Sequence, residues 1–329
     1  MRKALFLVAM IAVSCCNCAV GAIFQRDSTV KFTVIDYGGS PISNANICVR
    51  TFKKWVPGEN FGRDVTMDIR GKTDTNGLCK VSFLCKSMEF EYGVGAVGYY
   101  SAYSDKDVRF ARAGSGFTLR QTQFETNLVV RLKPIMKPIP MYVRASYKDS
   151  RRHFPKDAKA GIWGFDLKMG EWVRPYGNGE HTDFTVEYSY EHFSKDRVVD
   201  CALIFTNGVH DGFYIAKCTG TIFRSDYAAN TNAVYMKRLD FDSWGKKYKG
   251  NYAVEILDDD EYLVVRTRTK CDAHGNLISA NYAKIYGPIR FNDLFSHQGA
   301  YFNPNENDPN LEADTTVNLV LGGEKGFAP

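Results

Sequence analysis

The sequence of 329 residues lacks the residue arrangements that carry most hydrolytic and cofactor chemistry. None of its six histidines stands in a His-Glu-x-x-His or His-x-x-Glu arrangement, which excludes the usual helical zinc-protease site. No Gly-x-Ser-x-Gly elbow occurs, and Gly114-Ser115-Gly116 is typical of a flexible turn. We therefore predict no catalytic residue.

Long apolar runs are also lacking after the first residues. Arg2 and Lys3 precede the apolar run Ala4 to Val13, whose ten residues are too few to span about 30 Å of hydrocarbon. Val20-Gly21-Ala22 then supplies the small residues that a signal peptidase needs. This order predicts a signal peptide over residues 1–22, no transmembrane segment, and a secreted, periplasmic or cell-surface location.

Cysteines permit two further interpretations. Ala12-Val13-Ser14-Cys15 resembles a bacterial lipobox, with Ala12 where leucine is usual, so a lipid anchor at Cys15 is an alternative to simple cleavage after Ala22. Six cysteines follow residue 22, an even number that permits disulfides in an exported protein. Cys201 and Cys218 lie on successive predicted strands and are the best candidate pair.

Charge is nearly balanced. Lys and Arg number 42 against 37 Asp and Glu, giving a formal net charge of +5. A nucleic-acid-binding protein is expected to carry a clustered basic face, which this sequence does not show. We predict no nucleic-acid partner.

Alternation of apolar and polar residues dominates, and no amphipathic helix of useful length occurs. Val30, Phe32 and Val34 are typical of a half-buried strand. The pattern predicts an all-β chain with a sandwich over residues 23–133. Prolines at 134, 138 and 140 predict a stiff linker over residues 134–140, and further strand-like runs predict a second, mainly β, sandwich-like domain over 141–329.

The turns of the first domain resemble a known family. The pattern consists of Val34-x-Asp36, Gly39-x-Pro41-Ile42, Ala45-x-Ile47-x-Val49, Thr73-Asp74-x-Asn76-Gly77, Val94-x-Ala96 and Gly98-Tyr99. In order and turn chemistry it resembles carboxypeptidase regulatory-like domains over residues 28–133. The resemblance implies a prealbumin-like (transthyretin-like) Greek-key sandwich without catalysis of its own. The second domain resembles only uncharacterised exported bacterial proteins.

Two motifs match a known spacing without its structural context, and the acidic runs match no calcium-loop consensus. Residues 93–98 fit Gly-x-Gly-x-x-Gly, but a strand-like run follows instead of the helix that a dinucleotide site requires. Cys271-x-x-His274 has metal-ligand spacing but no second ligand pair, so we predict no metal site. Acidic runs such as Asp258 to Glu261 favour turns, with calcium as the one cofactor alternative.

Aromatic residues are dense in the second domain. Buried core is the ordinary interpretation; if a binding face exists, Trp163, Trp172 and Trp244 are its stacking residues, and Asp240 and Asp242 its hydroxyl or calcium ligands. We expect a non-enzymatic exported or cell-envelope protein that binds or scaffolds, with a glycan or an envelope protein as partner. A carbohydrate-binding module and a hydrolase with a carboxylate site in the second domain remain alternatives.

Overall fold

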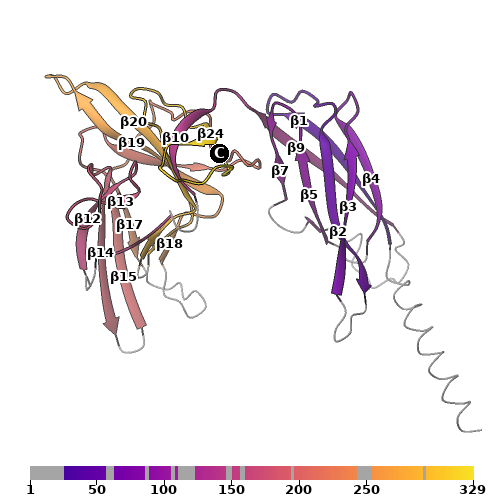
Figure 1. Cartoon of the computed structure of the whole chain (residues 1–329), viewed down its shortest axis with the longest axis horizontal. Coiled ribbons are helices and arrows are strands. Elements are labelled where there is room, and N and C mark those ends of the chain that lie inside the picture. The colour runs from indigo at the N-terminus through magenta and orange to yellow at the C-terminus, as the bar shows by residue number, and fades with distance from the viewer. Residues whose placement is uncertain are drawn as a thin grey trace, which may run out of the picture. The chain divides into compact units, whose positions relative to one another are not determined.

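The computed structural model describes residues 26–56, 63–85, 89–104, 108–109, 123–145, 150–155, 160–193, 196–242, 254–291 and 294–329. Every helix or strand in these ranges is a β-strand, which confirms the predicted all-β class (Figure 1). Within the same ranges, no helix has the length and apolar composition needed to cross a membrane. The predicted signal peptide and Cys15 lie outside the described residues.

The chain divides into two compact units. The first comprises Met1–Ile135 with the short segment Gly220–Ile222, and the second comprises Met136–Thr219 with Phe223–Pro329.

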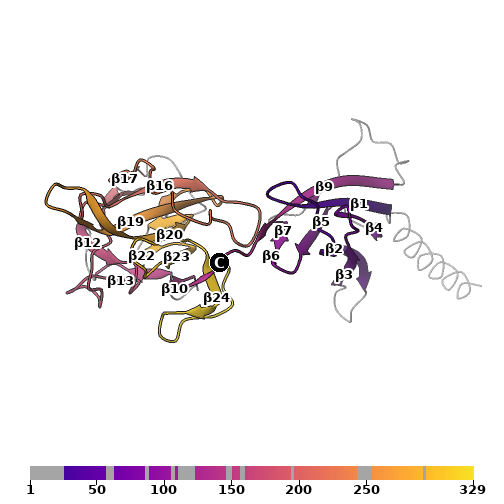
Figure 2. The same ribbon diagram turned by 90° about the horizontal axis from the view of Figure 1, so that it is seen from above.

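Two sheets build the first unit. Its strands are β1 (Arg26–Asp36), β2 (Asn46–Val56), β3 (Arg63–Lys72), β4 (Leu78–Cys85), β5 (Glu89–Gly95), β6 (Tyr99–Tyr100), β7 (Ala102–Tyr103), β8 (Val108–Arg109) and β9 (Gln123–Pro134). One sheet has the order β4-β1-β9-β6 and the other β3-β2-β5-β7, with β8 paired to β5. Figure 2 shows β1 and β9 side by side; they run parallel.

The core of this sandwich follows the alternation in the sequence. Val30, Phe32 and Val34 on β1 are buried together with Ile47 and Val49 on β2. On β1 the inward residues alternate with Lys31 and Thr33, because successive side chains of a strand point to opposite faces.

Three sheets build the second unit. Its strands are β10 (Ile139–Arg144), β11 (Arg151–His153), β12 (Ala160–Asp166), β13 (Glu171–Trp172), β14 (Phe184–Phe193), β15 (Asp196–Ile204), β16 (Gly212–Lys217), β17 (Arg238–Asp242), β18 (Val254–Ile256), β19 (Glu261–Cys271), β20 (Leu277–Tyr286), β21 (Ile289–Phe291), β22 (Leu294–Ser296), β23 (Gly299–Phe302) and β24 (Ala313–Asn318). Their orders are β16-β19-β20-β23-β10-β24, β11-β22-β21-β18 and β13-β12-β14-β15-β17.

The central strands β19 and β20 of the six-stranded sheet are largely buried on both faces. Leu263 and Val265 on β19 belong to the core shared with the other two sheets, whereas Tyr262 and Val264 belong to a separate apolar cluster on the opposite face. The continuous apolar run of this strand is the pattern expected when neither face meets water.

Candidate functional site

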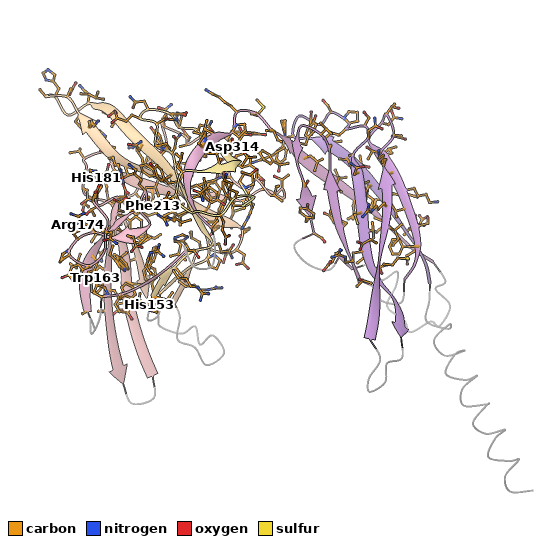
Figure 3. The ribbon with its side chains drawn as sticks, viewed as in Figure 1. His153, Trp163, Arg174, His181, Phe213 and Asp314 are labelled. Atoms are coloured by element: carbon orange, nitrogen blue, oxygen red, sulfur yellow. The ribbon has the colours of Figure 1, made fainter. Side chains whose placement is uncertain are left out.

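Two of the three tryptophans predicted as stacking residues lie in the core of the second unit. Trp163 on β12 and Trp172 on β13 are 4% and 3% exposed. Figure 3 labels Trp163 within the second unit. Both rings pack on Phe154 at centroid distances of 5.4 Å, and Trp172 Nε1 donates to the His153 carbonyl over 2.7 Å. Buried indoles offer no face to a ligand, so the prediction is wrong for these two residues. Trp244 lies outside the described residues.

The opposite face of the same sheet is exposed at its centre. Strand alternation turns Ile162 away from the core that holds its neighbour Trp163, and Ile162 is 64% exposed. In register, Ile162 faces Glu187 on β14, which in turn faces Ala202 on β15. This row of the outer face continues to Asp240 on β17.

A shallow hollow lies on this outer face. Because it is built by neighbouring strands of one sheet, its shape is fixed by the strand pairing. Its lining includes Ala160, Gly161, Ile162, Glu187, Tyr188, Ser189, Asp200, Cys201, Arg238 and Asp240. We call this surface the outer hollow.

The two aspartates predicted as ligands stand on the strand that borders the outer hollow. Asp240 lines the hollow, and Asp242 pairs in register with Asp200. The side chain of Asp242 lies outside the described residues. Sequence reasoning missed Glu187, Asp200 and Arg238. The strand that carries Arg238, β17, pairs with β15 although β16, which lies between them in the chain, belongs to another sheet.

One arginine links two carboxylates of the outer hollow. Arg238 lies 2.8 Å from Glu187 Oε2 and 2.5 Å from Asp240 Oδ1. These hydrogen bonds, chiefly the one to Asp240, raise the pKa of the Arg238 guanidinium. The lining therefore holds three carboxylates, Glu187, Asp200 and Asp240, against one guanidinium, and its balance is acidic.

A second group of charges is buried between sheets. Arg268 donates to both oxygens of Asp183 over 2.8 and 2.9 Å and to Asp166 over 2.9 Å. Asp166 also accepts the amides of Met169, Glu180 and His181 at 2.9 to 3.0 Å. Asp183 and Asp166 are 0% and 1% exposed, so both carboxylates are closed to solvent, whereas the Arg268 side chain is 19% exposed.

The two carboxylates differ in pKa because their surroundings differ. Burial raises the pKa of Asp183, and the opposing hydrogen bond from Arg268 does not cancel that effect. Burial also acts to raise the pKa of Asp166, but its three amide donors and Arg268 together hold it below the ordinary value. Asp166 and Asp183 are thus ion-paired with Arg268 inside the fold, and they do not face solvent as a catalytic acid and base would.

Lys284 lies inside a ring of aromatic side chains. It is 0% exposed, and its Nζ donates to Ser225 Oγ over 2.9 Å. The same atom lies 4.8, 5.1 and 4.6 Å from the ring centroids of Phe223, Tyr286 and Tyr301. Cation–π attraction of this kind stabilises a desolvated ammonium group.

The predicted disulfide is wrong. Cys201 and Cys218 are both free thiols, and they pack in different apolar clusters. Burial raises the pKa of the Cys201 thiol, which keeps it protonated and unreactive. Where side chains are described, no three His, Cys, Asp or Glu residues come together to hold a metal ion.

The chain has little similarity to known proteins in sequence or in structure. No protein-family model matches the chain, and no curated protein matches it. Among solved structures, the shaft pilin SpaA from Lactobacillus rhamnosus GG is 12% identical over 66% of this chain and 93% of the pilin, at a TM-score of 0.20. An aspartate-to-asparagine variant of that pilin is 11% identical over 66% of this chain and 94% of its own, also at 0.20.

Proposed function

We propose that this chain is an exported, non-enzymatic protein that binds or scaffolds, and that its second unit contacts a protein partner through the outer hollow. The observation that carries this proposal is the 64% exposed Ile162 beside the linked charges of Glu187, Arg238 and Asp240. An apolar centre with a charged rim is the usual composition of a protein interface. Export is supported by the leader sequence of residues 1–22.

The bonding of the buried charged groups supports a role other than catalysis. Asp166, Asp183 and Arg268 satisfy one another, and Lys284 is enclosed by Ser225 and aromatic rings. Groups that are committed to the fold in this way are not available to transfer protons to a substrate.

The first unit is proposed to be a carboxypeptidase regulatory-like sandwich. Thr73, which begins the turn motif, is 4% exposed; its Oγ1 donates to the Ile42 carbonyl over 2.7 Å and accepts the Ala45 amide over 2.8 Å. Asp74 Oδ1 accepts the amides of Asn76 and Leu78, each over 2.9 Å. The motif residues thus fix a turn, which suits a structural module.

The acidic balance of the outer hollow favours one type of partner for the second unit. Three carboxylates and one guanidinium favour a basic segment of a protein whose apolar side chain covers Ile162. Sugar recognition usually adds an exposed aromatic face, whereas Tyr188 in the hollow is only 6% exposed. The basic protein segment is therefore preferred over a glycan.

The test measures binding of the full chain to arrays of short basic-apolar peptides, acidic-apolar peptides and neutral glycans. We expect basic-apolar peptides to bind and to bind more weakly at high salt, because exposed charges are screened. Asp240→Lys and Ile162→Asp should weaken binding about tenfold. Asp226→Lys, an exposed position outside the hollow lining, is the matched control.

Three outcomes would overturn the proposal. Equal losses from Asp240→Lys and Asp226→Lys would remove the outer hollow from the interface. Binding of glycans alone would favour the carbohydrate-binding alternative. Turnover of any ligand that Asp240→Asn abolishes would show a hydrolase.

A further inference from the structure

The outer edge of β9 is largely unpaired among the described residues. β9 pairs with β1 from Gln123 to Leu132, and with β6 only at Lys133 and Pro134. Within the described part of the first unit, the side of β9 away from β1 therefore has no strand partner from Glu125 to Arg131. Such an edge is a template for pairing with another chain.

The hydrogen bonds of the neighbouring turn show which residues face this edge. Ile135 donates its amide to the Gly98 carbonyl over 2.8 Å, on the β6 side of β9. Backbone groups of successive strand residues point to opposite sides, and the register with β1 is continuous from Gln123 to Leu132. Glu125, Asn127, Val129 and Arg131 therefore direct their amides and carbonyls toward the open edge.

The side chains of these four residues lie on the outer face. Each of them is exposed, Val129 to 62%, whereas Val130 is buried and Leu128 packs against the core. A strand added at this edge would meet two charged, one polar and one apolar side chain on the outer face and the rim of the core on the other face.

We propose that this edge pairs with the same edge of a second copy of the chain, antiparallel, about a two-fold axis at Leu128. In this register Glu125 faces Arg131 of the second copy, and Asn127 faces its Val129. In both pairs the backbone amides and carbonyls of the two residues would bond to each other. The ion pair occurs twice by symmetry. With the axis at Asn127, Glu125 would face Val129 and Arg131 would face Gln123. With the axis at Val129, Glu125 would face Lys133, whose edge is already taken by Tyr100 of β6. Charge complementarity at the open edge therefore selects the pairing about Leu128.

Core packing favours the same pairing. Thr126 and Leu128, which are half-buried at the rim of the sandwich, would face Val130 and Leu128 of the second copy. Because the interface is isologous, a dimer uses the β9 edge of both copies and leaves neither of these two edges for further growth. The first unit thus gains a six-stranded sheet made from β4, β1 and β9 of each copy.

Sedimentation of the full chain over a concentration series tests the proposal. Arg131→Glu places two glutamates opposite each other twice and should raise the dimer dissociation constant about tenfold or more. Because Lys31 lies 3.2 Å from Glu125, the charge-swapped rescue combines Arg131→Glu with Glu125→Lys and Lys31→Glu. This variant should dimerise within about threefold of the original chain. Arg70→Glu, an exposed position on β3 in the other sheet, is the control and should dimerise normally.

Cross-linking tests the register. A mixture of Asn127→Cys and Val129→Cys chains should form an intermolecular disulfide between these positions, mapped by mass spectrometry, faster than either variant alone. A monomer at about 100 µM, equal dimerisation of the Arg131→Glu and Arg70→Glu variants, or faster linking of Asn127→Cys with itself would each overturn the proposal. Circular dichroism of every variant confirms that it remains folded.

Discussion

The carboxylate of Glu312 lies 2.8 Å from the backbone amide of Met136, where the second unit begins. Its other oxygen accepts the Lys137 amide over 2.6 Å, and Ile139 donates its amide to the Glu312 carbonyl over 2.9 Å. Glu312 is 1% exposed. The proline-marked segment predicted as a linker is therefore fixed to the second unit from Met136 onward.

Glu312→Ala should lower the free energy of unfolding by about 2–3 kcal/mol, because a buried carboxylate with two amide donors is lost. Glu312→Gln, which retains one carbonyl acceptor, should lose about half as much. Urea unfolding followed by the fluorescence of the buried tryptophans measures the second unit. Glu306→Ala removes an exposed glutamate and should cost under about 0.5 kcal/mol. Equal effects at the two positions would contradict the structural role of Glu312.

Arg268→Met should destabilise the second unit by about 3–5 kcal/mol, because Asp166 and Asp183 would remain buried without their common partner. The loss should shrink as pH falls, since protonation of Asp183, whose pKa burial already raises, removes one of the two charges. Urea unfolding of both chains at pH 7 and at pH 5 measures the loss of stability at each pH.

The control for this variant is Arg238→Met. Arg238 also bridges two carboxylates, but its side chain is 46% exposed, so its loss should cost under about 1 kcal/mol. A comparable cost at both arginines would show that burial does not set the strength of these ion pairs.

His297 should make the protein less stable in mild acid. Burial, reinforced by the nearby charge of Arg152, lowers the pKa of His297 to about 3, and its Nδ1 has no hydrogen-bond partner. Below about pH 6.5 the unfolded chain binds a proton that the folded chain does not bind until about pH 3. This group's contribution to stability therefore falls by about 1.4 kcal/mol for each pH unit between these values.

His297→Gln tests this expectation, because glutamine does not titrate. The difference in unfolding free energy between this variant and the original chain should change between pH 7 and pH 4, in favour of the variant at low pH. His274→Gln, at an exposed hairpin turn, is the control for the substitution itself. A difference that stays constant with pH would mean that His297 titrates normally.

The alternation of apolar and polar residues predicted the strands, and which face of them is buried, wherever the other face of the sheet meets water. Val30, Phe32 and Val34 are the clearest case, since their spacing alone places them together. The outer hollow could not be predicted in this way. Asp200 and Asp242 face each other across β15 and β17, but β16, which lies between them in the chain, belongs to another sheet. Register between such strands depends on tertiary packing.

The glycines at 93 and 95 illustrate the same limit. Their motif fits a nucleotide loop, which the strand-like residues after it argue against, but the local pattern does not explain why glycine is needed at these two positions. In the structure a Cβ on Gly93 would lie 2.9 Å from the Tyr103 ring, and one on Gly95 would lie 2.9 Å from Ser101 Oγ. The glycines therefore make room for the side chains of neighbouring residues on the outer face of the sheet.

Ile162 and Trp163 are adjacent in the chain and should respond in opposite ways to truncation. Trp163→Ala should lower the free energy of unfolding by about 3–5 kcal/mol, because it opens a cavity among Phe154, Trp172 and Tyr188. It should leave peptide affinity per folded molecule unchanged. Ile162→Ala should change stability by under about 0.5 kcal/mol, as exposed substitutions usually do, and should weaken peptide binding.

Urea unfolding and peptide titration on the same two preparations separate these effects, with the fraction of folded chain taken from the unfolding curve. Strand alternation makes the pair a matched control, since each variant removes an apolar side chain from β12 but on opposite faces. Loss of affinity in folded Trp163→Ala, with none in Ile162→Ala, would move the binding surface away from the outer hollow. It would also return a ligand-binding role to the tryptophan that the structure assigns to the core.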